Sequence, residues 1–224
     1  SRLQFHVAKH LFDALDSEVK KALATKISRE RIGQELEKTL SCARPDLAMH
    51  YINELDIFSI VFKLPPTLLL PETLNWDNKQ VLSNIRNLLR VLDATNTISL
   101  SADRRRILLY AVIMKDLTGF QYLTAKKKKE SASIFVMMES LKLSKNHSVD
   151  VEIILESWKQ LHGHLVDLSR DANTKLSRLE LGKLMRHCGE LWQEALFLAN
   201  LELLSGLGPF EVERADSPCE LLNV

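Results

Sequence analysis

The sequence contains few of the residues that interrupt helices or favour sheets. Its 224 residues include seven glycines, six prolines and only 6% aromatic residues. All-β proteins need frequent turns and many aromatic strand residues, so this composition argues against them and favours helices. No apolar run reaches the roughly 18 residues that a membrane-spanning helix requires. We therefore expect an all-α fold and no membrane partner.

Cysteine is equally sparse. Cys42, Cys188 and Cys219 are an odd number and form no Cys-x-x-Cys pair. Such usage is typical of free thiols in a reducing, intracellular compartment rather than of a disulfide framework. The formal net charge of +1 gives no global reason to expect nucleic-acid binding, so any such case rests on local charge.

Apolar residues recur along the chain with the 3.6-residue period of amphipathic helices. Pro65-Pro66 is the best candidate linker, and the Gly-Leu-Gly-Pro run from Gly206 ends the last helix. We find no internal repeat and predict no strand. The predicted helices cover residues 3–12, 16–24, 26–40, 45–55, 79–92, 102–117, 130–143, 149–167 and 175–205, the last with a bend at Gly189.

The best defined of these helices contains the string SRERIGQELEKTL. Ser28 is placed as the N-cap, and Glu30 puts negative charge near the positive end of the helix dipole. Ile32, Leu36 and Leu40 recur every four residues and form one apolar stripe.

This string resembles the S-x-E-R-I-x-x-E-L-x-K-x-L motif of class II tRNA nucleotidyltransferases, the family of the CCA-adding enzymes and the related bacterial poly(A) polymerases. In that family the helix lies in the neck, beside the nucleotide-binding pocket, and braces the catalytic head. The resemblance therefore implies a bracing role beside a nucleotide pocket for Ser28, Glu30, Arg31 and Glu35. The matching residues are Ser28, Glu30, Arg31, Ile32, Glu35, Leu36, Lys38 and Leu40.

Other segments resemble the same family, most closely its plant-type members. Residues 54–62, ELDIFSIVF, resemble the E-L-x-L-F-x-x-V-F segment that ends the neck. Residues 105–111, RRILLYA, resemble the R-R-x-x-L-Y-A helix of the body, and residues 175–205 resemble the last body helices more loosely. The implied organisation is a helical neck over residues 1–64, a helical body over 65–205, no β-sheet head, and a frayed or truncated tail over 206–224.

The residues that would carry nucleotide transfer are missing from this sequence. That reaction needs two metal-binding carboxylates, usually D-x-D on a strand, and a Gly-Ser turn whose N–H groups hold the triphosphate. The chain contains neither a D-x-D nor a Gly-Ser pair, and capping of a predicted helix explains the acidic pair Asp150 and Glu152. The resemblance implies that the head carries these parts together with magnesium, ATP and CTP. We expect this chain to bind no cofactor and to be inactive alone.

Positive charge is concentrated between residues 104 and 129, where Asp116 is the one acidic residue. Basic clusters hold phosphates by displacing counterions, and the family grips the tRNA acceptor stem through such backbone contacts. A solvated loop is the alternative for the lysine run. Arg29 and Arg31 are expected to brace the neck, with contact to RNA or nucleotide as the alternative. The candidates for RNA-backbone contact are Arg104, Arg105, Arg106, Lys126, Lys127, Lys128 and Lys129.

No metal site is predicted from the histidines. The candidates are His162 and His164 with the pair His187-Cys188. His162 and His164 lie two apart on a predicted helix and so point away from each other, and no fourth ligand is evident. Trp158 and Trp192 lie on apolar faces, and we expect both in the core.

Two functions follow from these expectations. The first is the RNA-positioning part of an enzyme that adds CCA to tRNA 3′ ends, located in the nucleus or cytoplasm, the mitochondrion or the plastid. Its partners would be the tRNA acceptor stem and a catalytic head that is absent from this chain. The alternative is a truncated paralogue that acts as a helical protein-interaction module. Its contact surface would be the neck stripe with Leu3, Val7 and Leu11, which the missing head leaves uncovered.

Overall fold

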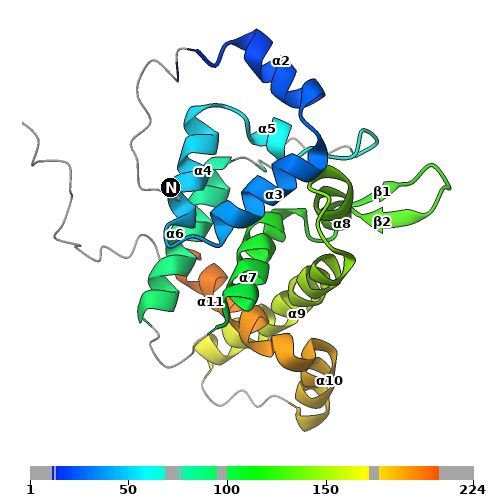
Figure 1. Cartoon of the computed structure of the whole chain (residues 1–224). Coiled ribbons are helices and arrows are strands. Elements are labelled where there is room, and N and C mark those ends of the chain that lie inside the picture. Colours follow the sequence, from blue (N-terminus) through cyan, green and yellow to red (C-terminus); the bar gives the residue numbers. More distant parts are fainter. Residues whose placement is uncertain are drawn as a thin grey trace, which may run out of the picture.

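The computed structural model of the protein describes residues 12, 14–68, 76, 78–94, 100–171 and 177–206. Over these residues the protein is mostly helical, as the composition predicts (Figure 1). The predicted helix over 3–12, with Leu3, Val7 and Leu11, falls outside the described residues except for Phe12, as do residues 207–224. None of the described helices is both long and apolar enough to span a membrane.

Four helices lie between residues 14 and 64 of the described chain, and two of them begin at the caps that the sequence predicts. Asp16 accepts a hydrogen bond from the N–H of Val19 at 2.8 Å, and Ser28 accepts one from the N–H of Arg31 at 3.4 Å. Such side-chain caps satisfy N–H groups that have no partner in the first turn. The four helices are α2 (Ser17–Lys26), α3 (Arg29–Leu40), α4 (Pro45–Glu54) and α5 (Phe58–Val61).

The helices after the proline pair match the predicted positions in all but one segment. Ser101 caps its helix as expected, and Gly189, with a φ of 53°, bends the last predicted helix into two. These helices are α6 (Asn78–Ala94), α7 (Ala102–Met114), α8 (Ala132–Phe135), α9 (Lys145–Arg170), α10 (Arg178–Cys188) and α11 (Trp192–Gly206). Helix α9 begins four residues before the predicted start. Its N-cap is Ser144, so Asp150 and Glu152 lie within the helix and capping does not explain them. Short 3₁₀ turns cover Lys115–Leu117 and Gly189–Leu191.

Helix α7 is the centre of the core. All eight residues from Ile107 to Met114 are buried, so this segment is apolar on every side rather than along one stripe. A helix of this kind has to be surrounded by other elements. Helices α3, α6, α9 and α11 all pack against it.

One cluster of buried side chains joins the two regions that the sequence divides at Pro65-Pro66. Leu36, Leu40 and Met49 from the first region pack in the same cluster as Ile85 and Leu108 from the second. Helix α4 also packs directly against α6. The helices on both sides of the proline pair therefore share their apolar core.

The prediction of a single helix over 130–143 and of no strand is wrong. Strands β1 (Gln121–Leu123) and β2 (Lys129–Ser131) form an antiparallel hairpin, with Tyr122 opposite Glu130. Helix α8 and a π-helical turn, Val136–Ser140, follow it. Strands of three residues are too short to give a visible alternation in a sequence window of 11–18 residues.

The two tryptophans differ in their surroundings. The side chain of Trp158 is buried, with 8% of its surface exposed, as predicted. Trp192 is 37% exposed, so its prediction as a core residue is wrong. It begins α11 directly after the 3₁₀ turn at Gly189, and this change of direction leaves its ring partly in solvent.

Helix α3 approaches the chain after the π-helical turn so closely that only glycine fits at position 33. A Cβ atom added to Gly33 would lie 1.8 Å from the carbonyl oxygen of Leu141. Real side-chain atoms never come so close, and a backbone carbonyl cannot rotate away as a flexible side chain can. The contact therefore fixes the distance between α3 and residue 141.

We expect Gly33→Ala to lower the free energy of unfolding by about 1–3 kcal/mol, because the new methyl group overpacks this contact. Urea unfolding followed by circular dichroism measures the change. Gly163→Ala and Gly182→Ala are matched controls in helices, since a Cβ there meets nothing within 4 Å. Both should leave stability unchanged or raise it by up to about 1 kcal/mol. Equal behaviour of all three variants would contradict the close packing.

Candidate functional site

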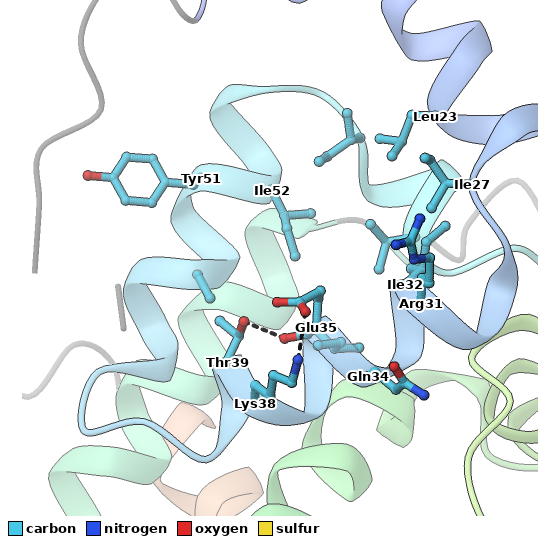
Figure 2. Close-up of a pocket in the computed structure, with 14 residues that line it drawn as sticks. Leu23, Ile27, Arg31, Ile32, Gln34, Glu35, Lys38, Thr39, Tyr51 and Ile52 are labelled. Atoms are coloured by element: carbon cyan, nitrogen blue, oxygen red, sulfur yellow. Dashed lines mark hydrogen bonds and ion pairs between the residues drawn. The ribbon is translucent and has the colours of Figure 1, made fainter. Parts of the chain in front are cut away.

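The motif helix lines a groove between α2, α3, α4 and α5 (Figure 2). Its volume is about 720 Å³. The walls are mainly aliphatic, while charged side chains from α3 stand at the rim. The lining residues are Leu23, Ile27, Arg31, Ile32, Gln34, Glu35, Leu36, Lys38, Thr39, Ala48, Tyr51, Ile52, Ile57 and Val61.

Ser28 and Glu30, the first two motif residues, serve the start of α3. The hydroxyl of Ser28 caps the helix, as described above. The side chain of Glu30 lies in the first turn and is fully exposed; hydrogen bonds from its own backbone N–H and from Ser28 hold its pKa below the usual value. Neither residue lines the groove, so their positions serve the helix rather than a ligand in that groove.

Arg31, Glu35 and Lys38 are the charged residues of the groove rim. Nζ of Lys38 lies 2.8 Å from Oε1 of Glu35, and both side chains are more than half exposed. Exposed pairs of this spacing contribute only about 0.3–0.5 kcal/mol to stability. The rim therefore presents exposed charge to solvent, while the aliphatic floor suits an apolar partner.

Arg29, at a variable position of the motif, makes the most extensive polar contacts of α3. Its Nη1 donates to the carbonyl of Ile60 at 2.7 Å, its Nη2 to that of Val61 at 2.5 Å, and its Nε to that of Ser140 at 2.5 Å. These carbonyls lie at the C-terminal ends of α5 and of the π-helical turn, where no N–H of the same helix reaches them. The guanidinium thus caps two helices at once, and its charge suits their negative ends.

Ser140 completes this junction. Its hydroxyl oxygen accepts hydrogen bonds from Nη2 of Arg29 at 2.7 Å and from the N–H of Lys63 at 2.8 Å. The hydroxyl proton in turn points to the carbonyl of Val61 at 3.3 Å. All the hydrogen-bonding capacity of this buried side chain is therefore used within the junction.

We expect Arg29→Ala to lower the free energy of unfolding by about 2–4 kcal/mol, because it leaves several partly buried carbonyl groups without a donor. Arg29→Lys should have an intermediate effect, since an ammonium group cannot reproduce the planar fork of donors. Chemical denaturation measures both changes. Arg31→Ala, two positions along and exposed, is the control and should change stability by no more than about 0.5 kcal/mol. A similar loss in the Arg29 and Arg31 variants would rule out this junction.

Arg104, Arg105 and Arg106 are all half-buried, and Arg104 and Arg106 are engaged within the protein. Nε of Arg105 is buried and has no hydrogen-bond partner among the described residues. Arg104 forms a double ion pair with Glu194 of α11, at 2.5 and 2.6 Å, and the carboxylate is fully buried. Its Nη2 also donates to the carbonyl of Glu190. Arg106 donates to Asp103 at 2.8 Å and to the hydroxyl of Ser41 at 3.2 Å. Arg104 and Arg106 thus hold α7 to its neighbours.

The lysine run lies elsewhere. Lys126 to Lys129 are all exposed, at and beside the tip of the β1–β2 hairpin, which extends away from the helices (Figure 1). Arg104 to Arg106 lie in the first two turns of α7, and the hairpin follows the other end of that helix. A helix of 13 residues is about 20 Å long, so the structure separates the two halves of the predicted RNA-contact cluster.

We expect Arg104→Met to destabilise the protein by about 3–5 kcal/mol, because it leaves the buried Glu194 carboxylate without a partner. The double variant Arg104→Met/Glu194→Met should recover most of this loss, and thermal unfolding of the single and double variants measures the coupling. Lys126→Met, at an exposed position with the same charge change, should be neutral. Additive effects of the two substitutions would contradict the buried pair.

A second, more polar cleft of about 530 Å³ lies at the base of the hairpin. His187 and Glu156 line it, and Nε2 of the His187 ring lies 3.2 Å from Oε2 of the Glu156 carboxylate. Nζ of Lys159 donates to the carbonyl of Thr118 at 3.2 Å. Within the part of the chain that the structure describes, no group of three or more His, Cys, Asp or Glu side chains is placed to hold a metal ion.

Comparison with known proteins adds no relative: no family model, curated protein or solved structure matches this chain.

Proposed function

We propose that this chain is the neck and body of a class II tRNA nucleotidyltransferase, and that it positions the tRNA acceptor stem for a catalytic head. The observation that carries the proposal is the motif helix α3. Its eight motif residues stand at the family's spacing, and three of them, Arg31, Glu35 and Lys38, form the charged rim of one groove. Magnesium, ATP and CTP would be bound by the head.

The two faces of α3 support a bracing role. Arg29, Gly33, Leu36 and Leu40 follow one another at four, three and four residues, so they share a face, and that face packs on the body. The opposite side carries Arg31 and the other rim residues. A rigid helix with one face fixed and one free can hold a second domain in a defined orientation.

The groove also supports a second candidate, the helical protein-interaction module. Aliphatic residues such as Ile32, Ile52 and Ile57 line a concave surface, and an amphipathic helix binds an apolar groove through its own apolar face. In this reading the groove binds an unrelated protein, and no nucleotide transfer takes place in the complex. The two candidates therefore differ in whether RNA is a substrate.

Transfer of radiolabelled AMP to a tRNA ending in CC distinguishes them. We expect no transfer by the chain alone and measurable transfer when a separately produced family head is added. Charge reversal at the rim, Arg31→Glu with Lys38→Glu, should weaken this activation at least about ten-fold by removing two favourable charges and adding two unfavourable ones. Lys21→Glu, exposed on α2 and outside the groove, is the control and should not.

Absence of transfer with the head, from a chain whose helical circular dichroism is intact, would overturn the nucleotidyltransferase proposal. It would favour the interaction module if the chain then bound an amphipathic helix through the groove. Transfer by the chain alone would contradict both candidates.

A further inference from the structure

The β1–β2 hairpin has the features of an arm built to reach a polyanion. Its tip carries four consecutive lysines, all exposed, and Nζ of Lys128 lies 4.0 Å from Oε1 of Glu130 in an ion pair at the limit of contact. Exposed ion pairs of this length contribute little. The positive charge of the tip therefore remains available to a partner outside the chain.

The tip has a defined conformation. The N–H of Thr124 donates to the carbonyl of Lys128 at 2.9 Å, and the N–H of Lys127 donates back to the carbonyl of Thr124 at 2.8 Å. The hydroxyl of Thr124 accepts from the N–H of Lys128 at 3.1 Å. Lys127 itself adopts a φ of 57°, which turns the chain at the tip. Binding then needs to order only the lysine side chains, which lowers its entropic cost.

The base of the hairpin is anchored to the helices. The ring of Tyr122 packs edge-on against Phe135 of α8 at 5.2 Å, and its hydroxyl donates to Glu130 at 3.1 Å. Burial, this hydrogen bond and the nearby negative charge raise the pKa of Tyr122 to about 12, so the hydroxyl stays protonated as a donor. On the other strand, Ser131 donates to Glu152 of α9 at 2.9 Å.

We infer that the hairpin tip, Lys126 to Lys129, binds the phosphodiester backbone of an RNA stem, and that Arg104 and Arg106, which are paired within the protein, take no part in this contact. Lysine acts on phosphates as a point charge, without the planar fork that would read a base edge. Contacts of this kind fix the position of a nucleic acid and carry no sequence information. This inference deepens the proposed function and rests on it for the identity of the partner.

Binding of a fluorescent RNA duplex to the full chain, measured by anisotropy over a range of salt concentrations, tests the inference. Each lysine that neutralises a phosphate adds about 0.9 to the slope of log affinity against log salt. Replacing all four lysines by alanine should therefore reduce the magnitude of the slope by about 3.6. A rise from about 50 to 200 mM salt should then weaken wild-type binding roughly 150-fold more than binding of the variant.

Matched variants keep the test specific. Replacement of Lys21, Lys26, Lys79 and Lys183 by alanine removes the same charge from exposed positions elsewhere and should leave the slope unchanged. Replacement of the four tip lysines by arginine keeps the charge and should retain binding. Arg104→Met should leave the slope unchanged when measured below its unfolding temperature.

An unchanged slope in the alanine variant of the tip would overturn the inference, as would an equal loss in the control set. Equal dependence of poly-glutamate binding on the tip lysines would overturn the assignment to an RNA stem, because it would show a site for any polyanion. The assay contains no head domain. Its failure is therefore distinct from a failure of the proposed function, which the transfer assay measures.

Discussion

The guanidinium of Arg29 is the contact on which the arrangement of the first helices depends. Helix α5 has four residues, so none of its own N–H groups reaches the carbonyls of Ile60 and Val61. The π-helical turn ends at Ser140 with the same deficit. One planar cation supplies donors to both ends and draws them to the first turn of α3. A water molecule or a lysine in place of the guanidinium would satisfy fewer of these carbonyl groups in a fixed geometry.

The contact at Gly33 follows from the same geometry. One turn after Arg29, the same face of α3 meets Leu141, the residue that directly follows Ser140. The short hydrogen bonds of Arg29 bring the backbone of α3 close to the backbone at residues 140 and 141. At the point of contact, α3 therefore needs a residue without a Cβ atom, which is Gly33. Leu36 and Leu40 then continue this face into the core around α7. The opposite side of the helix, with Arg31 and Lys38, is exposed to solvent, because the face with Arg29, Gly33 and Leu36 packs against the rest of the protein.

Local patterns predicted the helices well, because caps and periodicity act within one or two turns. Ser28, Ser101 and Gly189 each have their expected effect. The hairpin could not be predicted, since its strands of three residues are held by Phe135 and Glu152, which lie outside them. The same limit applies to the site. The rim residues follow from the motif spacing, but the partners of Arg29 lie about 30 and 110 residues away along the chain, where helix periodicity gives no signal.

The basic residues between positions 104 and 129 are close in the sequence but have different surroundings in the structure. Arg104 and Lys126 belong to one basic stretch of the sequence, yet only the lysine is free to meet a phosphate. If Arg104 left the fully buried Glu194 carboxylate, that charge would remain unpaired, which costs several kcal/mol. A solvent-exposed contact with a phosphate contributes less than this cost. A lysine at a hairpin tip loses only hydration and side-chain freedom. Whether a basic residue has a buried acidic partner, rather than how many basic residues the stretch contains, therefore decides which of them can bind a nucleic acid.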